Sequence, residues 1–166
     1  MDNFLGTLFE KIVVAIGAAL IVGLLLRYFS VSKTQQAILQ ATETTANIQS
    51  LYHTQNNFTS LTNAVVIDGK LASKDMISGA NLVNPWSGEI TFAVNASNPA
   101  QYTMMQSGVP NDACAKLAMG IAGHVSVKVN NGTEYNSATN PLDAGAATTA
   151  CNSATDSNTL TFVFGR

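Results

Sequence analysis

The longest apolar stretch of the chain lies near its N-terminus. Every residue from Ile12 to Leu26 is apolar or glycine, and this run would form a helix about 22 Å long. Apolar residues extend the zone to Phe4 and Phe29, which is enough to cross a bilayer core of about 30 Å, but the longer zone contains Glu10 and Lys11. A helix that is apolar on all sides must be surrounded by lipid or by other chains. We therefore expect residues 1–29 to form a transmembrane or assembly helix.

A second pattern follows without interruption, because no proline occurs before Pro85. Apolar or small side chains recur mostly at steps of three or four, which predicts an amphipathic helix. They are Val31, Ile38, Ala41, Thr45, Ile48 and Leu51 or Tyr52, and the polar residues largely off this stripe are Gln35, Gln36, Gln40, Glu43, Asn47 and Gln49. The two patterns together predict a nearly continuous helix from about Asn3 to about Gln55, with residues 30–57 as its amphipathic part.

From residue 58 to 166 the pattern changes to short alternating runs between turn residues, which predicts a separate head. The expected runs are 65–67, ended by Asp68-Gly69, then 89–94, 102–106, 125–129 and 160–164. Asn130-Asn131-Gly132 predicts a hairpin turn, residues 110–121 a short helix, and residues 139–156 a loop held by Cys151. The fold class that this predicts is α+β, with an antiparallel sheet packed on the C-terminal half of the long helix.

The charge distribution supports this division of the chain. Charged residues make up 11% of the sequence, against about 25% in ordinary soluble domains, and Asn, Gln, Ser and Thr together number 53 of 166 residues. The net charge of −2 argues against a nucleic-acid binder, and the presence of one apolar run argues against a multi-pass membrane protein. The first 57 residues hold three basic and three acidic side chains, as expected of a helix that becomes buried.

Two features of the apolar run leave alternatives open. A removable signal peptide fits poorly, because a basic leader and a small-residue cleavage site are both missing, while Arg27 and Lys33 would place the head of a simple anchor in the cytoplasm. This conflict would disappear if a basic leader preceded Met1 and were removed. The glycines of this region allow either close helix packing, which we favour, or local loss of helicity, and they are Gly6, Gly17 and Gly23.

The cysteines and histidines of this chain favour structural roles over catalytic or metal-binding ones. The chain has two cysteines, Cys114 and Cys151, and this even count favours one disulfide. The sequence alone also allows a Cys–His nucleophile pair. His53 and His124 are not at metal-ligand spacing to either cysteine. We expect His53, at the end of the long helix, to be a C-terminal capping or surface residue, and His124 to be exposed in a turn. No catalytic or cofactor fingerprint occurs, so we expect no catalytic, cofactor or metal site and no enzyme.

Four local motifs together resemble those of the type IV pilins, in particular the type IVb subclass of bundle-forming, toxin-coregulated and conjugative thin pili. They are Gly6–Val14, with its small apolar set, glutamate and apolar run; Ile48–Leu61, at the helix end; Asn84–Ile90, with its Asn-Pro-aromatic start; and Asp112–Leu117, with the first cysteine. The family's glutamate usually lies at the fifth mature residue, where this chain has Leu5. Its role, pairing with a neighbouring N-terminal amine, therefore passes to Glu10, with Asp2 as a second candidate.

The resemblance implies a major pilin that polymerises through its apolar helix into an extracellular filament of a Gram-negative bacterium, after a stage in the inner membrane. The residues that we expect in assembly are Met1, Asp2, Phe4, Glu10, Lys11, Ile12, Ile16, Leu20 and Leu24. The implied partners are copies of the chain, a prepilin peptidase, the pilus assembly machinery, and a recipient or host cell surface. The implied use is conjugation, which we slightly favour, or adhesion. The alternatives are a minor pilin or pseudopilin and a membrane-anchored periplasmic binding module.

Overall fold

The computed structural model describes residues 32–136 and 138–165. The chain divides into two compact units, Met1–Ser32 and Lys33–Arg166, and only the second is described below. The expectations for residues 1–31, which include all the proposed assembly residues and the three glycines of the apolar run, lie outside the described residues. Among the described residues, none of the helices has the length and apolar character needed to cross a membrane.

The first described element is helix α2, Lys33–Leu51, which realises the amphipathic pattern. Its buried face consists of Ala37, Gln40, Ala41, Thr44, Thr45 and Ile48. Gln40 differs from expectation, because the sequence places it off the stripe, whereas the buried face is wide enough to include it. The helix ends at Leu51, a turn earlier than expected; Tyr52 is then buried and Leu51 is exposed. The imidazole Nδ1 of His53 lies 2.9 Å from the carbonyl oxygen of Ser50, so His53 does flank the helix end.

The segment after α2 contains short elements, one of which corrects the sequence analysis. Residues 65–67, expected as a short extended run, belong to helix α3, Asn63–Asp68. Thr62 begins this helix with its hydroxyl, which accepts a hydrogen bond from the backbone N–H of Val65 at 3.3 Å. This local cap outweighs the β-propensity of the three branched residues. A 3₁₀ turn, Lys74–Met76, leads into the small strands β1, Ile77–Ser78, and β2, Asn81–Val83.

The antiparallel sheet follows the expected runs closely. Its larger strands are β3, Glu89–Asn95, β4, Asn98–Val109, β5, His124–Val129, β6, Glu134–Asn136, and β7, Asn158–Phe164. The spatial order is β1-β2-β3-β4-β7-β5-β6, so the C-terminal strand β7 lies between β4 and β5. The hairpin expected at Asn130-Asn131-Gly132 is confirmed, because β5 pairs with β6 directly across it.

Two helices lie in the C-terminal half. Helix α4, Asn111–Gly120, confirms the expected helix, with Cys114 and Leu117 on its buried face. Helix α5, Ala144–Ala150, lies in the segment expected to be a loop, so that expectation was wrong. The carboxylate of Asp143 accepts a hydrogen bond from the backbone N–H of Ala146 at 2.8 Å and caps this helix. The helix was not predicted because its alanines lie in a low-complexity segment, where the capping role of Asp143 was not considered.

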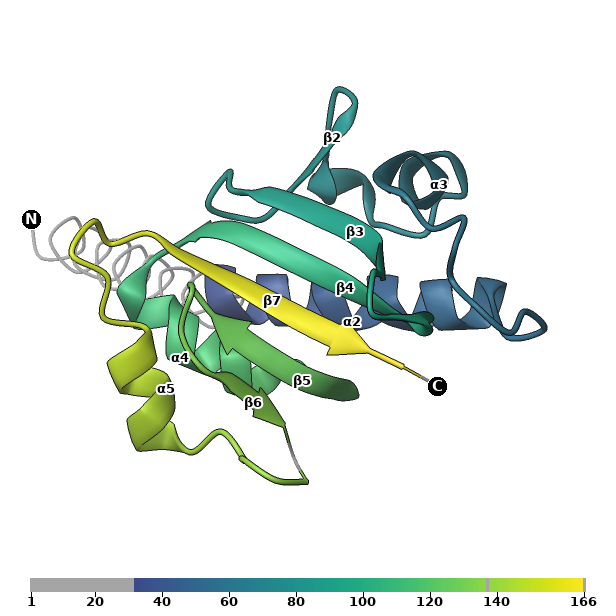
Figure 1. Cartoon of the computed structure of the whole chain (residues 1–166). Coiled ribbons are helices and arrows are strands. Elements are labelled where there is room, and N and C mark those ends of the chain that lie inside the picture. Colours follow the sequence, from purple (N-terminus) through teal and green to yellow (C-terminus); the bar gives the residue numbers. More distant parts are fainter. Residues whose placement is uncertain (1–31, 137, 166) are drawn as a thin grey trace, which may run out of the picture. The chain divides into compact units, whose positions relative to one another are not determined.

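The head has a layer of helices on one face of the sheet. Figure 1 shows α2 and α4 behind β3, β4, β7 and β5, with no helix in front of these strands. The strands alternate accordingly: β7 has Leu160, Phe162 and Phe164 buried toward the helices, and Thr161 and Val163 half-buried on the other face. Burial of one sheet face against helices is the usual reason for a period-two pattern.

The turn between β2 and β3 is held by one asparagine. The side-chain oxygen of Asn84 accepts hydrogen bonds from the backbone N–H groups of Trp86 and Gly88, at 3.1 and 2.9 Å. Its amide nitrogen donates to the carbonyl of Ser107 at 2.8 Å, which joins the turn to β4. Trp86 is half-buried and packs against the core. The Asn-Pro-aromatic motif is thus a structural corner.

We expect Gly88→Ala to destabilise the head by about 3 kcal/mol. A Cβ at this position would lie 1.8 Å from the carbonyl oxygen of Ser107, and this backbone atom can move only if the β3–β4 pairing shifts. The measurement is urea unfolding of variant and wild type.

Gly79→Ala is the matched control for this substitution. Gly79 has φ +64° with nothing within 4 Å of its Cβ position, so its replacement should cost only the left-handed strain of about 1 kcal/mol. Equal losses in the two variants would contradict a steric cause at Gly88.

Candidate assembly surface

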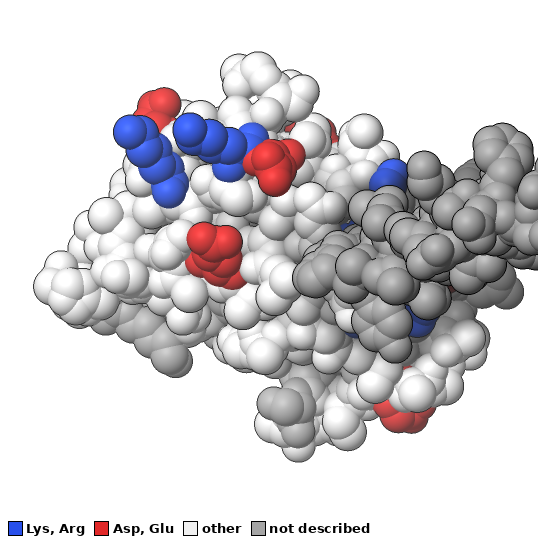
Figure 2. Space-filling view, turned by 180° about the vertical axis from the view of Figure 1, so that it is seen from behind, with Lys and Arg blue, Asp and Glu red and all other residues white. Residues whose placement is uncertain are grey.

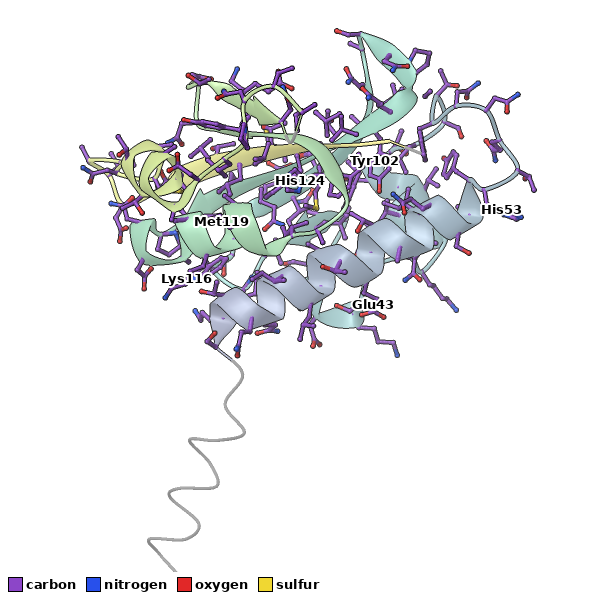
Figure 3. All side chains as sticks on the ribbon, turned by 90° about the horizontal axis from the view of Figure 1, so that it is seen from below. Glu43, His53, Tyr102, Lys116, Met119 and His124 are labelled. Carbon is purple, nitrogen blue, oxygen red and sulfur yellow. A yellow bond between two sulfur atoms is a disulfide. The ribbon has the colours of Figure 1, made fainter. Side chains whose placement is uncertain are left out.

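The outer side of α2 is the first candidate surface. Leu39 is 63% exposed on the side of α2 opposite its buried face, and Leu51 is 47% exposed at the last residue of the helix. Thr42, Glu43 and Ala46 are exposed between them, and Glu43 is the only charged side chain of α2 after Lys33. Figure 3 shows Glu43 on the side of the helix that points away from the sheet. This face is weakly charged and carries one large apolar side chain, Leu39.

Charges are also sparse on the helix side of the head. Figure 2, which views the molecule from this side, shows Lys, Asp and Glu side chains gathered mainly at one edge, with mostly uncharged described surface elsewhere in the view. The segment around α3 holds charges of both signs, from Asp68, Lys70, Lys74 and Asp75. A surface of this kind exerts little long-range repulsion on its copies, which permits close packing of heads.

The expected disulfide is present and buried. Cys114 in α4 and Cys151 after α5 are bonded, with exposed fractions of 0% and 2%. Because both sulfurs are used, the alternative of a Cys–His nucleophile pair is wrong. The bond joins α4 to the end of α5 and closes the C-terminal part of the head, at a sequence separation of 37.

An asparagine cluster fastens the same region without covalent bonds. The buried Asn158 donates to the carbonyl of Val109 at 3.1 Å and to the side-chain oxygen of Asn111 at 2.8 Å. Asn130 donates to the side-chain oxygen of Asn158 at 2.9 Å, and it also binds the carbonyl of Ala150 at 3.2 Å, just before Cys151. Sequence reasoning missed this cluster, because asparagines in a chain with 16 of them carry no spacing signal.

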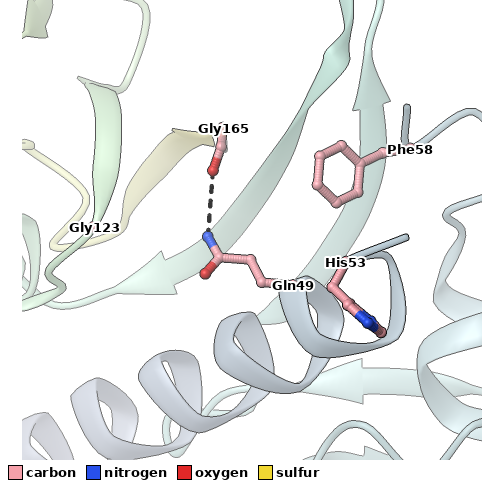
Figure 4. Close-up of a pocket in the computed structure, with 5 residues that line it drawn as sticks. All are labelled: Gln49, His53, Phe58, Gly123 and Gly165. Atoms are coloured by element: carbon pink, nitrogen blue, oxygen red, sulfur yellow. Dashed lines mark hydrogen bonds between the residues drawn. The ribbon is translucent and has the colours of Figure 1, made fainter. Parts of the chain in front are cut away.

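Two pockets are formed by described residues of the head. A pocket of about 510 Å³ is lined by Gln49, His53, Phe58, Gly123 and Gly165, and Figure 4 shows the Gln49 amide donating to the carbonyl of Gly165 at 3.4 Å. A pocket of about 210 Å³ lies beside Met119 and His124. Within the described ranges there is no group of three His, Cys, Asp or Glu residues that could hold a metal ion.

Structural contacts surround both His124 and the buried Tyr102. His124 begins β5 and is half-buried, not exposed in a turn as expected; its Nδ1 lies 2.7 Å from the carbonyl oxygen of Ile121, and its ring packs edge-on against Phe162. Burial raises the pKa of Tyr102 above its ordinary value, and its hydroxyl donates to the carbonyl of Thr45 in α2 at 3.4 Å. Tyr102 thus stays neutral and joins the sheet to α2.

Comparison with known proteins agrees with this arrangement. The bundlin family model matches residues 30–164. Among solved structures, the chain is similar to TcpA, a type IV pilin from Vibrio cholerae El Tor biotype, with a TM-score of 0.51 and 14% sequence identity over 77% of this chain and 98% of that one. At this identity the likeness shows the fold alone. No curated protein matches the chain. Because the family match spans nearly the whole described head, the chain belongs to the bundlin family of type IVb pilins, which are structural subunits and not enzymes.

Proposed function

We propose that the chain is the major subunit of a type IV pilus and polymerises through its N-terminal apolar segment. The observation that carries this proposal is the apolar run Ile12–Leu26, which directly precedes a head with a core of its own. The buried core cluster is built from residues 37–164, from Ala37 in α2 to Phe164 in β7. We propose that the run is buried first in lipid and then among copies of itself.

The driving force of assembly is burial of this run. Of its 15 residues, 13 are neither glycine nor charged, among them Ile12, Ile16, Leu20 and Leu24. Burial contributes roughly 1.5–3 kcal/mol for each large apolar side chain, so removing the run from water is favourable by tens of kcal/mol. This figure leaves out the entropy that the subunit loses on assembly. Such a helix is stable in the inner membrane or among its copies and unstable in water, so extraction from the membrane has to be coupled to polymerisation.

The exposed side of α2 supports the same function. Leu39 and Leu51 are exposed in α2, the helix that follows the apolar segment in the sequence. Both side chains would add apolar area to contacts between neighbouring subunits. Met1, Asp2 and Phe4 lie at the start of the segment, where the family's N-terminal amine takes part in assembly. Processing by a prepilin peptidase and export by the assembly machinery belong to this proposal.

We expect Glu10→Ala to reduce piliation strongly. A carboxylate inside an apolar core is costly unless it is paired, and an N-terminal amine or Lys11 of the chain or its neighbour could pair with it and set the axial register. The measurement is the yield of filaments in sheared surface material together with their subunit rise.

The matched control is Asp68→Ala, which removes an exposed acid at the end of α3 and should leave the yield unchanged. Normal piliation with an unchanged rise in Glu10→Ala would reject the register role of Glu10.

Negative-stain microscopy of sheared surface material tests the proposed function. We expect fibres in which this chain is the abundant protein by mass spectrometry, since a major pilin makes up most of its filament. Low abundance within fibres built of another pilin would favour a minor pilin or pseudopilin. A chain that stays monomeric in detergent and forms no fibre would favour a membrane-anchored binding module. Among the uses of such a fibre, we propose conjugation ahead of adhesion, on family resemblance.

A further inference from the structure

The turn between β5 and β6 presents an asparagine followed by a glycine, Asn131 and Gly132, and both residues are exposed. The preceding Asn130 is held firmly, because its amide nitrogen donates to the carbonyl of Ala150 and to the side-chain oxygen of Asn158, at 3.2 and 2.9 Å. The side chain of Asn131, by contrast, has no hydrogen-bond partner among the residues that the structure describes. The Asn131 amide is therefore free to turn toward the backbone that follows it.

The backbone nitrogen of Gly132 becomes available once a single hydrogen bond opens. Its N–H donates to the carbonyl of Val129 at 3.1 Å, across the tip of the hairpin. Strand β6 has three residues and is the outermost strand of the sheet, beside β5 in Figure 1. Exposed turns and short edge strands open locally at a small part of the global free energy of unfolding. Glycine has no Cβ to hinder its own nitrogen, so in the open turn this nitrogen reaches the side-chain carbon of Asn131.

We propose that Asn131 is a site of spontaneous deamidation for which Gly132 supplies the nucleophile. The amide nitrogen of Gly132 gives its proton to solvent base and forms a bond to Cγ of Asn131. The bond from Cγ to the side-chain nitrogen breaks, and that nitrogen takes up a proton from solvent and leaves as ammonia. Water then opens the resulting cyclic imide at either carbonyl, which gives aspartate or isoaspartate. One water is consumed and one ammonia is released, without oxidation or reduction.

The chain has one comparable pair, Asp68-Gly69, which lacks the same freedom. The N–H of Gly69 donates to the carbonyl of Val65 at 3.0 Å and closes the end of helix α3. A carboxylate is also a poorer electrophile than an amide, because its negative charge repels the attacking nitrogen. Asn131 is thus the position at which a side-chain amide, a following glycine and an exposed hairpin turn coincide.

Conversion of Asn131 would alter the hairpin and its attachment to the end of α5. Isoaspartate carries the backbone through its side-chain carbon, so the turn gains a methylene between strands that are in register at Lys128 and Glu134. Asn130, at the start of the turn, links the hairpin to the carbonyl of Ala150. We therefore expect the aged form to have weaker protection of the β5 and β6 amides from hydrogen exchange, with the disulfide intact.

Ageing of the purified full chain in detergent micelles tests the proposal. The chain is incubated for weeks in mildly alkaline buffer at physiological temperature, and peptide mass spectrometry that separates aspartate from isoaspartate forms follows each asparagine. We expect Asn131 to convert about tenfold faster than any other asparagine, with isoaspartate among the products, because the following glycine leaves ring closure unhindered. The experiment needs no filaments, so its result does not depend on the proposed function.

Three variants test the chemistry of the turn. Gly132→Ala should slow conversion about tenfold, because the added methyl group hinders the attacking nitrogen. Its Cβ would lie 3.1 Å from the carbonyl oxygen of Val129, a contact that a small shift of the exposed turn relieves. Gly79→Ala, in the turn between β1 and β2, is the matched control and should leave the rate unchanged. Asn131→Gln keeps an amide at the tip but needs a larger ring, so this position should stay unmodified over the same period.

Conversion of Asn131 in the folded chain, slowed in Gly132→Ala, supports the proposal. A rate at Asn131 no higher than at other asparagines, or a rate unchanged in Gly132→Ala, would overturn it. Aspartate as the sole product would also overturn it, because direct hydrolysis by water gives no isoaspartate. The same incubation in urea is the last comparison: conversion in urea without conversion in the folded chain would mean that the hydrogen bond from Gly132 to Val129 protects the site, which again contradicts the proposal.

Discussion

Leu20→Asp is expected to abolish filaments while the head still folds. Leu20 lies near the middle of the apolar run Ile12–Leu26. An aspartate at the centre of a membrane helix costs about 3 kcal/mol even where water and headgroups can be reached, and an unpaired carboxylate among packed copies costs more. Because every subunit of a filament carries the same change, the penalty is repeated at each addition. The measurement is the amount of fibre in sheared surface material.

Leu20→Met is the matched control, because it keeps an apolar side chain of similar volume and should leave the yield within about twofold. Resistance of the head to protease shows that the loss is one of assembly and not of folding. Membrane fractionation further separates a subunit that fails to insert from one that inserts and fails to polymerise. Abundant fibres in Leu20→Asp would refute the role of the run in the filament core.

Removal of the disulfide is expected to lower the free energy of unfolding of the head by about 4 kcal/mol. The sequence separation of 37 between Cys114 and Cys151 makes the closed loop long, so the unfolded chain gains much conformational freedom when the bond is absent. For a domain of this size the loss is a large part of the total stability. The measurement is urea unfolding of the oxidised wild type and of Cys114→Ala with Cys151→Ala, which leaves no thiol to be misoxidised.

The folded structure should survive this loss under native conditions. Asn158, Asn130 and Asn111 hold the segment around Cys151 by hydrogen bonds that do not depend on the disulfide. A matched comparison is the wild type with its disulfide reduced, which should lose a similar amount. If the double variant lost less than about 1 kcal/mol, the entropic account of the bond would be wrong. A greater loss for the variant than for the reduced wild type would point to packing around the sulfurs.

The elements that alternation and caps define could be predicted from the sequence. The runs at 89–94, 102–106, 125–129 and 160–164 became strands because one face of each is buried against helices. Residues 65–67 became helical because Thr62 caps them, and residues 144–150 because Asp143 does. Short caps of this kind decide between helix and strand where the hydrophobic pattern is too short to do so.

The candidate surfaces were harder to predict than the elements. Leu39 lies in an amphipathic helix, and periodicity alone does not say that a leucine beside the stripe is left exposed. The composition of the helix-free face of the sheet depends on strand order, since β3 and β5 border the same four strands only when β7 lies between β4 and β5. The buried position of Gln40 depends on the width of the contact between α2 and the sheet. Such features follow from tertiary arrangement and leave no local signal.

The measurement that tests the central claim most directly is a helical reconstruction by electron cryo-microscopy of filaments purified with this chain as their only subunit. The account predicts a filament whose core is formed by residues 12–26 of many copies, with the heads outside it and the head fold unchanged. Filaments held together by heads alone, with the apolar run outside the core, would contradict the account.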